Sequence, residues 1–317
     1  YELAANEYYW GGKPGTDTIT VLNIANDTKV SAMLAGDIDV AVAPSSTTLS
    51  QIEGNDTIEM VKVTGTRESD LEMNCREGRP TADVNLRKAL SYAIDRDVIA
   101  QIAGAGYAQA LGKAFPDSVG YDEGKEVESQ TYDVEKAKEY LAEAGYADTD
   151  GNGYVEKDGE ELVLNIALRS NASTAVYQAM QDMWKAVGIH VEIQLMENTS
   201  EIRESGEFDF MGGGWQTVNN ADGQSYLKNR WSDNGPDNYT AFHSDAFQEV
   251  MDRLDAAFDY DERVQCFVDA EQILTEESPT LFLYANENVT LINTDTVENV
   301  TVFPIDYYMI TADWTAK

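Results

Sequence analysis

The chain has 317 residues, of which 43% are hydrophobic and 10% aromatic, and this composition is ordinary for a globular protein with room for two domains. It carries 57 acidic and 22 basic residues, which gives a formal net charge of -35. That balance argues against nucleic acid and anionic membranes as partners, because both require a basic surface. A preference for cationic ligands is one interpretation of the charge, and solubility is the simpler one.

The sequence offers few signs of a membrane segment or a disulfide framework. No apolar run approaches the roughly 20 residues that a bilayer-spanning helix needs. Residues 1–5 lack the basic region and hydrophobic segment of a signal peptide, so a cytoplasmic protein and a shortened chain are both open alternatives. Cys75 and Cys266 are the only cysteines, and we expect two separate buried side chains rather than a bridge.

The first 78 residues predict part of a sheet domain, because short apolar runs alternate there with turn residues. Gly78 and Pro80 mark a natural boundary. The expected elements are strands at 18–24, 38–43, 58–63 and 71–75 and a short helix at 30–34.

A repeated helix and strand pattern gives the clearest signal in the chain. Asp133 stands at an N-cap position and Gly145 just past the end of the first helix. Strands joined through a helix are expected to lie parallel, and ligands collect beyond their carboxyl ends. A short strand at 208–211 runs into a glycine-rich turn that would place Trp215 at that edge. The pattern comprises helices at 133–145 and 176–187 and strands at 162–168 and 189–195.

The rest of the chain predicts further helices and a pair of strands, with no internal repeat. Residues 111–130 are rich in glycine and charge and predict a loop that wraps the second domain. The remaining elements are helices at 83–102, 247–258 and 264–274 and strands at 281–284 and 289–292.

One acidic loop resembles a calcium-binding loop in its spacing. Its oxygen-bearing residues occupy positions 1, 3, 5 and 7, but Gly159 stands at position 12, where a bidentate Glu is expected. Glu156 lies close enough to substitute. The same residue types also form ordinary turns, so a calcium site and a plain turn both stay open. The candidate ligands are Asp148, Asp150, Asn152 and Tyr154.

No catalytic motif is present, and we expect neither enzymatic activity nor a required cofactor. The chain lacks a nucleophile elbow, a zinc-protease helix, a phosphate loop and a dinucleotide fingerprint. His190 and His243 are the only histidines, and neither has neighbours at the spacing of metal ligands.

Four stretches in order make the chain resemble the family 5 extracellular solute-binding proteins, the peptide, nickel and opine receptors of ABC importers. The stretches are 7–14 with 33–39, 84–95, 132–153 and 184–193. The resemblance implies an α/β, two-lobed fold of the type II periplasmic-binding-protein kind, with mixed sheets flanked by helices. It also implies that 1–78 are a remnant of sheet domain I, that 79–285 form the second lobe, domain III, and that 286–317 return to domain I.

The resemblance implies an exported monomer that binds short peptides between two lobes and delivers them to an ABC permease. Such a protein would lie in the periplasm or be lipid-anchored at the cell surface, and its lobes would close about hinges near Gly78 and Asn286. A nickel-chelate or metallophore receptor of the same family is the first alternative. A calcium-stabilised surface adhesion or scaffold module, based on the loop at 148–153, is an alternative of another class.

Trp215 is the first candidate ligand-binding residue, because an indole after three glycines can stack on a ligand, although it can also cover the core. In peptide-binding relatives an aspartate three residues later commonly holds the ligand's amino terminus, but Val218 stands there in this chain. Polar contacts are still expected in the stretch that follows, from Asn219, Asn220 and Asp222.

Arg169 ends the strand at 162–168 and resembles an arginine that relatives use near the ligand's carboxylate, where a guanidinium can donate two hydrogen bonds. A solvent-facing arginine in an interdomain salt bridge is the alternative. Tyr226, Tyr239 and Tyr307 are further candidates to line the binding chamber, although most tyrosines in such a protein pack half-buried.

Overall fold

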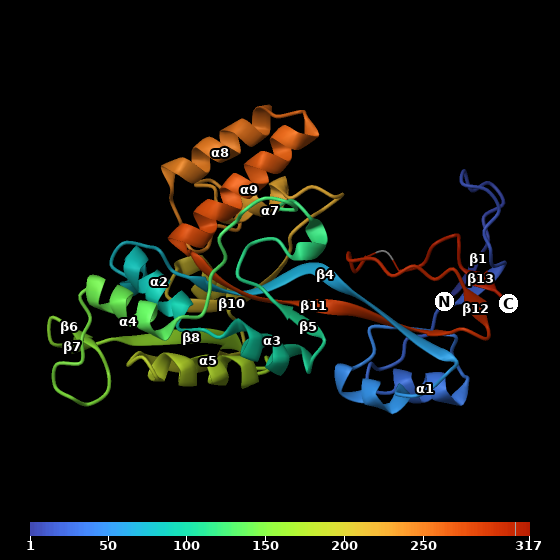
Figure 1. Ribbon diagram of the computed structural model, residues 1–317, viewed down its shortest axis with the longest axis horizontal. Helices are drawn as coiled ribbons and strands as arrows, with labels where there is room; N and C mark the ends of the chain where they lie inside the picture. The colour runs from blue at the N-terminus through green and yellow to red at the C-terminus, as the bar shows by residue number, and fades with distance from the viewer. Residues whose placement is uncertain (308) are drawn as a thin grey trace. The chain divides into compact units, whose positions relative to one another are not determined.

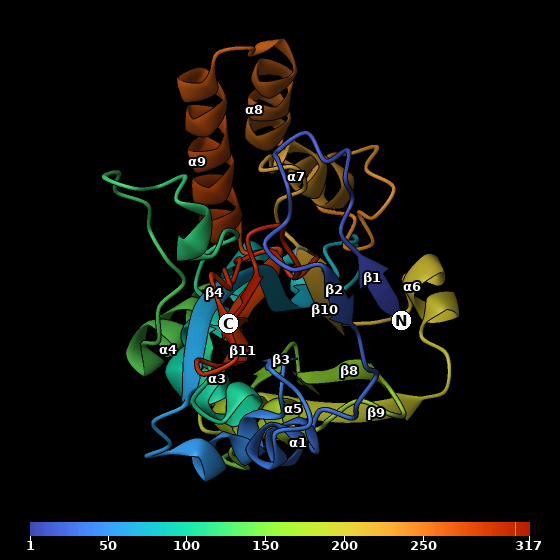
Figure 2. The ribbon, with the colours of Figure 1, turned by 90° about the vertical axis from the view of Figure 1, so that its right-hand side faces the viewer.

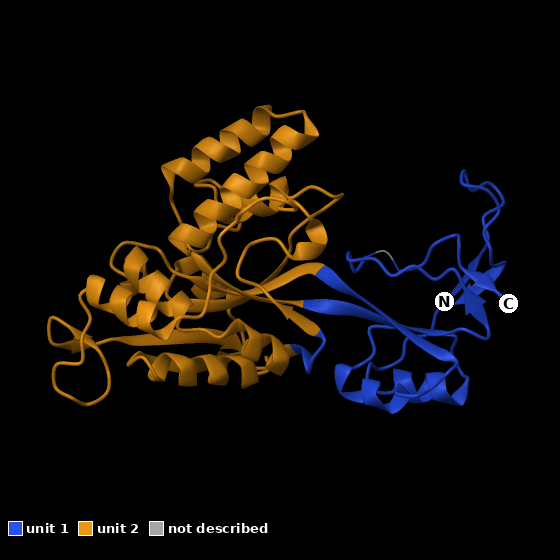
Figure 3. Cartoon of the chain, viewed as in Figure 1, with its two compact units in different colours: residues 1–65, 104–107, 286–317 blue, residues 66–103, 108–285 orange. Residues whose placement is uncertain are grey.

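The computed structural model describes residues 1–307 and 309–317, which divide into two compact units (Figure 3). Unit 1 comprises Tyr1–Gly65, Gly104–Tyr107 and Asn286–Lys317, and unit 2 comprises Thr66–Ala103 and Ala108–Ala285. The division at Asn286 coincides with a predicted boundary. The other expected boundary, Gly78, lies outside the division, which falls at Gly65 instead.

That difference arises because one long strand, β4 (Ile58–Met73), replaces the two short strands predicted there. Its middle carries Glu68 and Asp70, which are 0% and 1% exposed although their residue types favour loops. The predicted strands at 281–284 and 289–292 likewise form a single strand, β11 (Thr280–Asn293).

Unit 1 contains a small apolar core under short strands. β3 (Val40–Val42) pairs antiparallel with the second half of β11, and α1 (Lys29–Ala35) packs nearby, ended by Gly36 in the left-handed conformation. Two further antiparallel pairs join β1 (Glu2–Ala4) to β2 (Thr18–Thr20) and β12 (Val297–Glu298) to β13 (Thr315–Ala316), and η1 (Ser46–Ile52) precedes β4. The buried residues of this core are Val30, Met33, Ala41, Leu49, Ile52, Ile58, Val289 and Leu291.

Unit 2 is built on a mixed sheet in which β11, β4, β10, β8 and β9 are neighbours in that order. The predicted helix and strand repeat is confirmed: β8 (Val163–Arg169) lies parallel to both β9 (His190–Met196) and β10 (Phe210–Gln216), whereas β4 runs antiparallel to β10. The short strand β5 (Ala108–Ala110) pairs with β11.

Helices cover both faces of the unit 2 sheet (Figures 1 and 2). The lower face in Figure 1 carries α5 (Ala175–Lys185), whose Trp184 is fully buried, donates to the Leu90 carbonyl at 3.0 Å and stacks on Phe210. The opposite face carries α7 (Gln224–Trp231), α8 (Asp245–Ala256) and α9 (Tyr260–Glu277), and Figure 2 shows the last two side by side. The apolar core beneath α5 also contains side chains of α2 (Val84–Tyr92), α3 (Arg96–Gly104) and α4 (Val134–Glu143).

Side-chain caps account for the accuracy of several helix predictions. Asp133 accepts hydrogen bonds from the Glu135 and Lys136 amides, as expected from its position before α4. Several short elements were not predicted, among them α6 (Ser200–Ser205), α7, β6 (Glu156–Lys157), β7 (Glu160–Glu161), η2 (Pro80–Ala82) and η3 (Asp117–Val119). Within the described residues, every helix is too short or too polar to span a bilayer.

The loop at 111–130 is fastened to α9 through a buried carboxyl group. Glu271, 1% exposed, accepts a 2.8 Å hydrogen bond from the Phe115 amide. Burial raises the pKa of Glu271 to about 8, although this hydrogen bond and Lys113 oppose the rise.

Glu271 should therefore make stability fall as pH rises. Between the ordinary carboxyl pKa of the unfolded chain and about 8 in the folded protein, only the folded state keeps the proton, so each pH unit costs up to about 1.4 kcal/mol. We expect Glu271→Gln to reduce the loss of unfolding free energy between pH 5 and pH 8, measured by urea denaturation. The exposed Glu276→Gln on the same helix is the control, and parallel pH curves for wild type and Glu271→Gln would contradict the assignment.

Candidate ligand-binding site

One edge of β10 lacks a strand partner over most of its length. On one side β10 pairs with β4 along its whole length, from Phe210 opposite Met73 to Gln216 opposite Arg67. On the other side it pairs with β8 only at Phe210 and Met211. Residues 212–216 therefore form a free edge among the described residues, and we call this stretch the free edge of β10. The glycines predicted to form a turn lie inside this strand, which corrects that prediction.

Two of the three glycines, Gly212 and Gly213, are required because neighbouring side chains fill the space where a Cβ would lie. A Cβ at Gly212 would collide with the hydroxyl of Tyr177, and one at Gly213 would collide with the Asp70 carboxylate. Glycine inside a strand commonly marks such a close approach. At residues 212–214 the backbone of the free edge consequently carries no side chains of its own.

A cavity of about 400 Å³ adjoins the free edge at the carboxyl ends of β8 and β9. Arg169, Arg203 and Gly212 are among the residues that line it, together with Tyr177 from α5. A second cavity of about 190 Å³ shares Tyr177 and Gly213 with the first. Arg169 lies at the carboxyl end of β8, as expected, and its role toward a ligand stays a prediction.

Arg203 is a cavity residue that the sequence analysis missed. Its guanidinium lies 3.5 Å from the Gly212 carbonyl, 3.8 Å from a Glu72 carboxylate oxygen and 5.0 Å from the centre of the Tyr239 ring. Arg169 is exposed, and its guanidinium makes no ion pair or hydrogen bond within the described residues. The only available signal for Arg203 was an isolated arginine among the acidic residues at 197–209. Two guanidinium groups therefore line one cavity.

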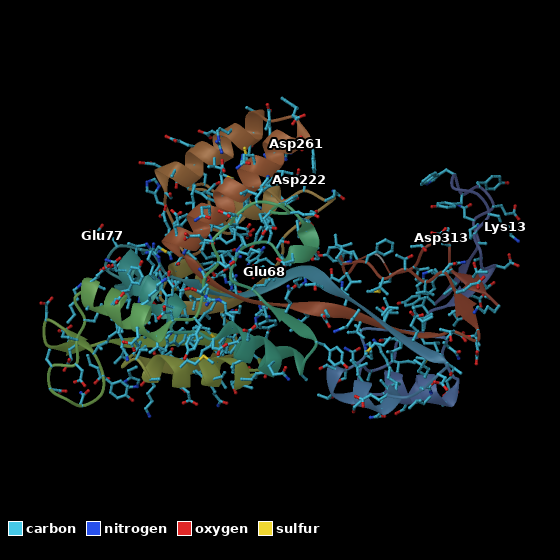
Figure 4. All side chains as sticks on the ribbon, viewed as in Figure 1. Lys13, Glu68, Glu77, Asp222, Asp261 and Asp313 are labelled. Atoms are coloured by element: carbon cyan, nitrogen blue, oxygen red, sulfur yellow. The ribbon has the colours of Figure 1, made fainter. Side chains whose placement is uncertain are left out.

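Three carboxylates lie buried on β4, the strand that pairs with the other edge of β10. They occupy alternate positions and therefore lie on one face of the sheet. We call Glu68, Asp70 and Glu72 the β4 acid cluster; none is more than 1% exposed, and Glu68 is labelled in Figure 4. The guanidinium of Arg230 on α7 bonds all three, at 2.9 Å, 2.5 Å and 2.9 Å respectively. Burial, reinforced by the neighbouring Asp70, raises the pKa of Glu68 well above its ordinary value.

Trp215 stands over this cluster and is half-buried. The centre of its ring lies 4.7 Å from the Arg230 guanidinium, which also lies 4.5 Å from the Trp231 ring. The predicted exposed position of Trp215 is therefore only partly realised. One side of the residue packs on a buried cation, and its backbone belongs to the free edge.

Tyr226 does not line a cavity, contrary to prediction. It is 4% exposed, and its hydroxyl donates to Glu68 at 3.2 Å and lies 3.3 Å from the Ala114 carbonyl. Because α7 was not predicted, the direction of this side chain could not be inferred from the sequence. Tyr226 supports the β4 acid cluster from below.

The polar stretch after Trp215 folds into a tight turn. Asn219 and Asp222 are bridged through their backbones, and the Asp222 carboxylate binds Arg263 at 2.6 Å, so this carboxylate already has a cation. Asn220 is exposed in the left-handed conformation, and Val218 is buried. Of the other predicted tyrosines, Tyr239 is half-buried beside Arg203, whereas Tyr307 is exposed in unit 1.

The predicted calcium loop brings three carboxylates together. Oxygen atoms of Asp148, Asp150 and Glu156 lie within 4.8 Å of one another, so Glu156 takes part although the terminal ligand position is Gly159. Asn152 accepts from the Tyr154 amide through its side-chain oxygen at 2.7 Å. Backbone amides of the loop also donate to Asp148 and Asp150, as in ordinary turns. A hard cation or a plain turn fits this arrangement.

The histidines and cysteines lie outside the candidate ligand-binding site. His190 pairs with Glu161 at 2.7 Å and His243 with Asp233 at 2.8 Å, each at the protein surface. Cys75 and Cys266 are free, as predicted.

Comparison with known proteins identifies the family of the chain. Residues 1–238 match the family described as bacterial extracellular solute-binding proteins, family 5 middle. The oligopeptide-binding protein AppA of Bacillus subtilis is 27% identical over 342 residues, covering 100% of this chain and 59% of AppA. The dipeptide-binding protein of Escherichia coli is 25% identical, covering 87% of this chain and 51% of that protein. The chain thus spans little more than half the length of these relatives.

Solved structures agree with the two-lobed, α/β prediction. The nickel ABC transporter protein from Bacillus halodurans superposes with a TM-score of 0.85 at 25% identity, covering 99% of this chain and 66% of that one. AppA of Bacillus subtilis in complex with a nonapeptide gives a TM-score of 0.74 at 24% identity, covering 100% and 64%. The family match over residues 1–238 and this likeness of fold together show that the chain belongs to the bacterial extracellular solute-binding proteins of family 5.

Proposed function

We propose that the protein is the solute-binding component of an ABC importer, that it binds short peptides outside the cytoplasmic membrane and that it presents them to the permease. The free edge of β10 carries this proposal. Along residues 212–216 the backbone donors and acceptors that point away from β4 have no strand partner in the described chain, and an extended peptide can add to such an edge as a further strand. The names of AppA and of the E. coli dipeptide-binding protein agree with peptide binding.

The cavity beside the free edge supports a role for the peptide's carboxylate. Arg169 and Arg203 both line it, and a guanidinium binds a carboxylate through charge-assisted hydrogen bonds. In this proposal the peptide backbone pairs with residues 212–216, its C-terminus points to the two arginines, and Trp215 packs against a ligand side chain. Asn219 and Asn220 are left for polar contacts, since Asp222 is held by Arg263.

The nickel-chelate alternative rests on a specific observation, which is that Val218 occupies the position where peptide-binding relatives carry an aspartate. The Bacillus halodurans protein is also named as a nickel transporter. In that alternative the two arginines would hold the carboxylates of a chelator and no strand would form along the free edge. We favour the peptide because the free edge offers more to a backbone than to a compact chelate. Either ligand is consistent with a periplasmic protein and with one that is lipid-anchored at the cell surface.

Arg203→Ala tests the carboxylate role. A charge-assisted hydrogen bond contributes about 1.5–3 kcal/mol, so we expect roughly 10- to 150-fold weaker binding of a free-acid peptide by the variant. The same peptide with a C-terminal amide should bind wild type and variant alike, and titration calorimetry measures both. Equal loss for acid and amide would contradict the orientation. A peptide with N-methylated backbone amides serves as the companion ligand, because it cannot pair with the free edge.

We also propose that the loop at 148–156 binds Ca²⁺, supported by the approach of Glu156 to Asp148 and Asp150. Millimolar Ca²⁺ should then raise the melting temperature of wild type and of the control Asp158→Asn, but not of Asp150→Asn. Asp158 is exposed on the adjacent turn and lies outside the group of three carboxylates. Identical melting of all three proteins with and without Ca²⁺ would leave the plain turn as the correct interpretation.

A further inference from the structure

We infer that Arg230 is a positioning residue of the ligand site: it touches no ligand and fixes the indole of Trp215 beside the free edge of β10. The expected effect of Arg230 on ligand binding rests on the proposed function, in which Trp215 contacts the ligand. The geometry that carries it is independent of any ligand.

The indole of Trp215 has no hydrogen bond that could fix its orientation. Its Nε1 is buried and has no partner among the described residues. Asp70 Oδ1, also buried and without a partner, lies over the same glycine: a Cβ on Gly213 would meet both atoms. A donor and an acceptor thus lie near one another unpaired. Buried polar atoms of this kind usually find partners. The orientation of the indole therefore depends on a contact other than a hydrogen bond.

Arg230 supplies that contact. Its guanidinium is 2% exposed and lies 4.7 Å from the centre of the Trp215 ring and 4.5 Å from that of Trp231. A planar cation between two indoles favours one ring orientation, because the attraction acts through the ring faces. The plane of the guanidinium is in turn fixed by its bonds to Glu68, Asp70 and Glu72. The orientation of Trp215 is therefore set from inside the protein.

The cation stays charged throughout the usable pH range. Burial alone would lower the pKa of Arg230, but the three carboxylates outweigh it and raise the pKa above its ordinary value. The group acts as a permanent support for Trp215. A lysine in its place could keep the charge but has neither the planar fork nor the stacking surface.

Arg230→Lys and Trp215→Phe, singly and combined, test the inference. First, the Trp215 contribution to the near-ultraviolet circular dichroism is obtained by subtracting the Trp215→Phe spectrum in each background. We expect this contribution to be at least halved by Arg230→Lys, while the far-ultraviolet spectrum is unchanged. A Trp215 spectrum that survives Arg230→Lys would overturn the inference, whether or not any peptide binds.

Second, binding of trialanine is measured calorimetrically in the same four proteins. We expect Arg230→Lys to weaken binding about tenfold in the Trp215 background and to have no further effect in the Trp215→Phe background, because the two residues act as one unit. Additive losses would assign Arg230 a merely structural role. If the wild type binds neither trialanine nor any longer peptide, the proposed function fails, and the spectroscopic comparison still decides the role of Arg230.

If the Arg230→Lys protein does not fold, a second variant still tests the inference. Glu68→Gln, Asp70→Asn, Glu72→Gln and Arg230→Met combined leave no buried charge in the cluster, and neutral replacements of buried ion clusters commonly fold. We expect this protein to lose the Trp215 spectrum as well. Retention of that spectrum in the neutral protein would overturn the inference.

Discussion

Arg230→Met is expected to lower the free energy of unfolding by about 3–5 kcal/mol, the usual cost of removing one partner from a buried ion pair. The side chain is 2% exposed and is the only cation that bonds all three members of the β4 acid cluster within the described residues. Without it, the buried carboxylates would keep only hydrogen bonds from Tyr226 and Thr280 and the Arg203 guanidinium 3.8 Å from Glu72. Urea denaturation at pH 7 measures the loss.

The pH dependence of this loss follows from the same cluster. Burial raises the pKa values of Glu68 and Glu72 in the wild type, and removal of the guanidinium should raise them further. A carboxyl group with a raised folded pKa stabilises the protein at low pH and loses that contribution as pH rises, so the deficit of Arg230→Met should be larger at pH 8 than at pH 5. The matched control is the neutral variant that combines Arg230→Met with Glu68→Gln, Asp70→Asn and Glu72→Gln. Its loss of unfolding free energy should be smaller than that of Arg230→Met alone. A deficit independent of pH would contradict this account.

Gly213→Ala is the second change for which we expect a large effect. Its new methyl group would press on the Asp70 carboxylate, which is 1% exposed and fixed by Arg230 and Thr280, so it cannot move aside freely. Forcing a methyl group into a packed site usually costs about 1–3 kcal/mol. Thermal and urea unfolding should both show the loss.

Gly214→Ala provides the control one residue away. A Cβ there would meet the Glu68 carbonyl at 3.4 Å, an ordinary contact, and the residue is exposed. We expect a change of no more than about 0.5 kcal/mol, as for surface substitutions generally. Equal destabilisation by the two alanines would show that glycine at 212–214 serves the strand backbone rather than the space of Asp70.

The sequence predicted the helical part of the fold well because local signals determine it. Asp133 caps α4 as expected, and the apolar face of α5 places Trp184 in the core. Capping and a period of 3.6 residues act within a few residues of sequence, so they can be recognised without tertiary information. The parallel order of β8 and β9 followed from the helix that joins them.

The sequence predicted both ends of β4, but it could not predict the middle of that strand or the acid cluster, because their stabilisation is not local. The run Thr64 to Asp70 is polar and looks like a loop, yet it forms a buried strand since Arg230, far along the chain, supplies the counter-ion. α7, which carries that arginine, has only a weak apolar stripe. The same reasoning explains the error at Tyr226, whose hydroxyl donates to Glu68 of the buried cluster.

A thermal-shift screen of the full-length protein tests the central claim most directly. The ligands are di- to hexapeptides, and nickel with and without chelators, each near 100 times the expected dissociation constant, where binding adds about 2.7 kcal/mol of stability. We predict that peptides with a free carboxylate raise the melting temperature, and that Arg203→Ala reduces the rise by about half or more. A rise in melting temperature with chelated nickel, and no rise with any of the peptides, would contradict peptide binding along the free edge of β10.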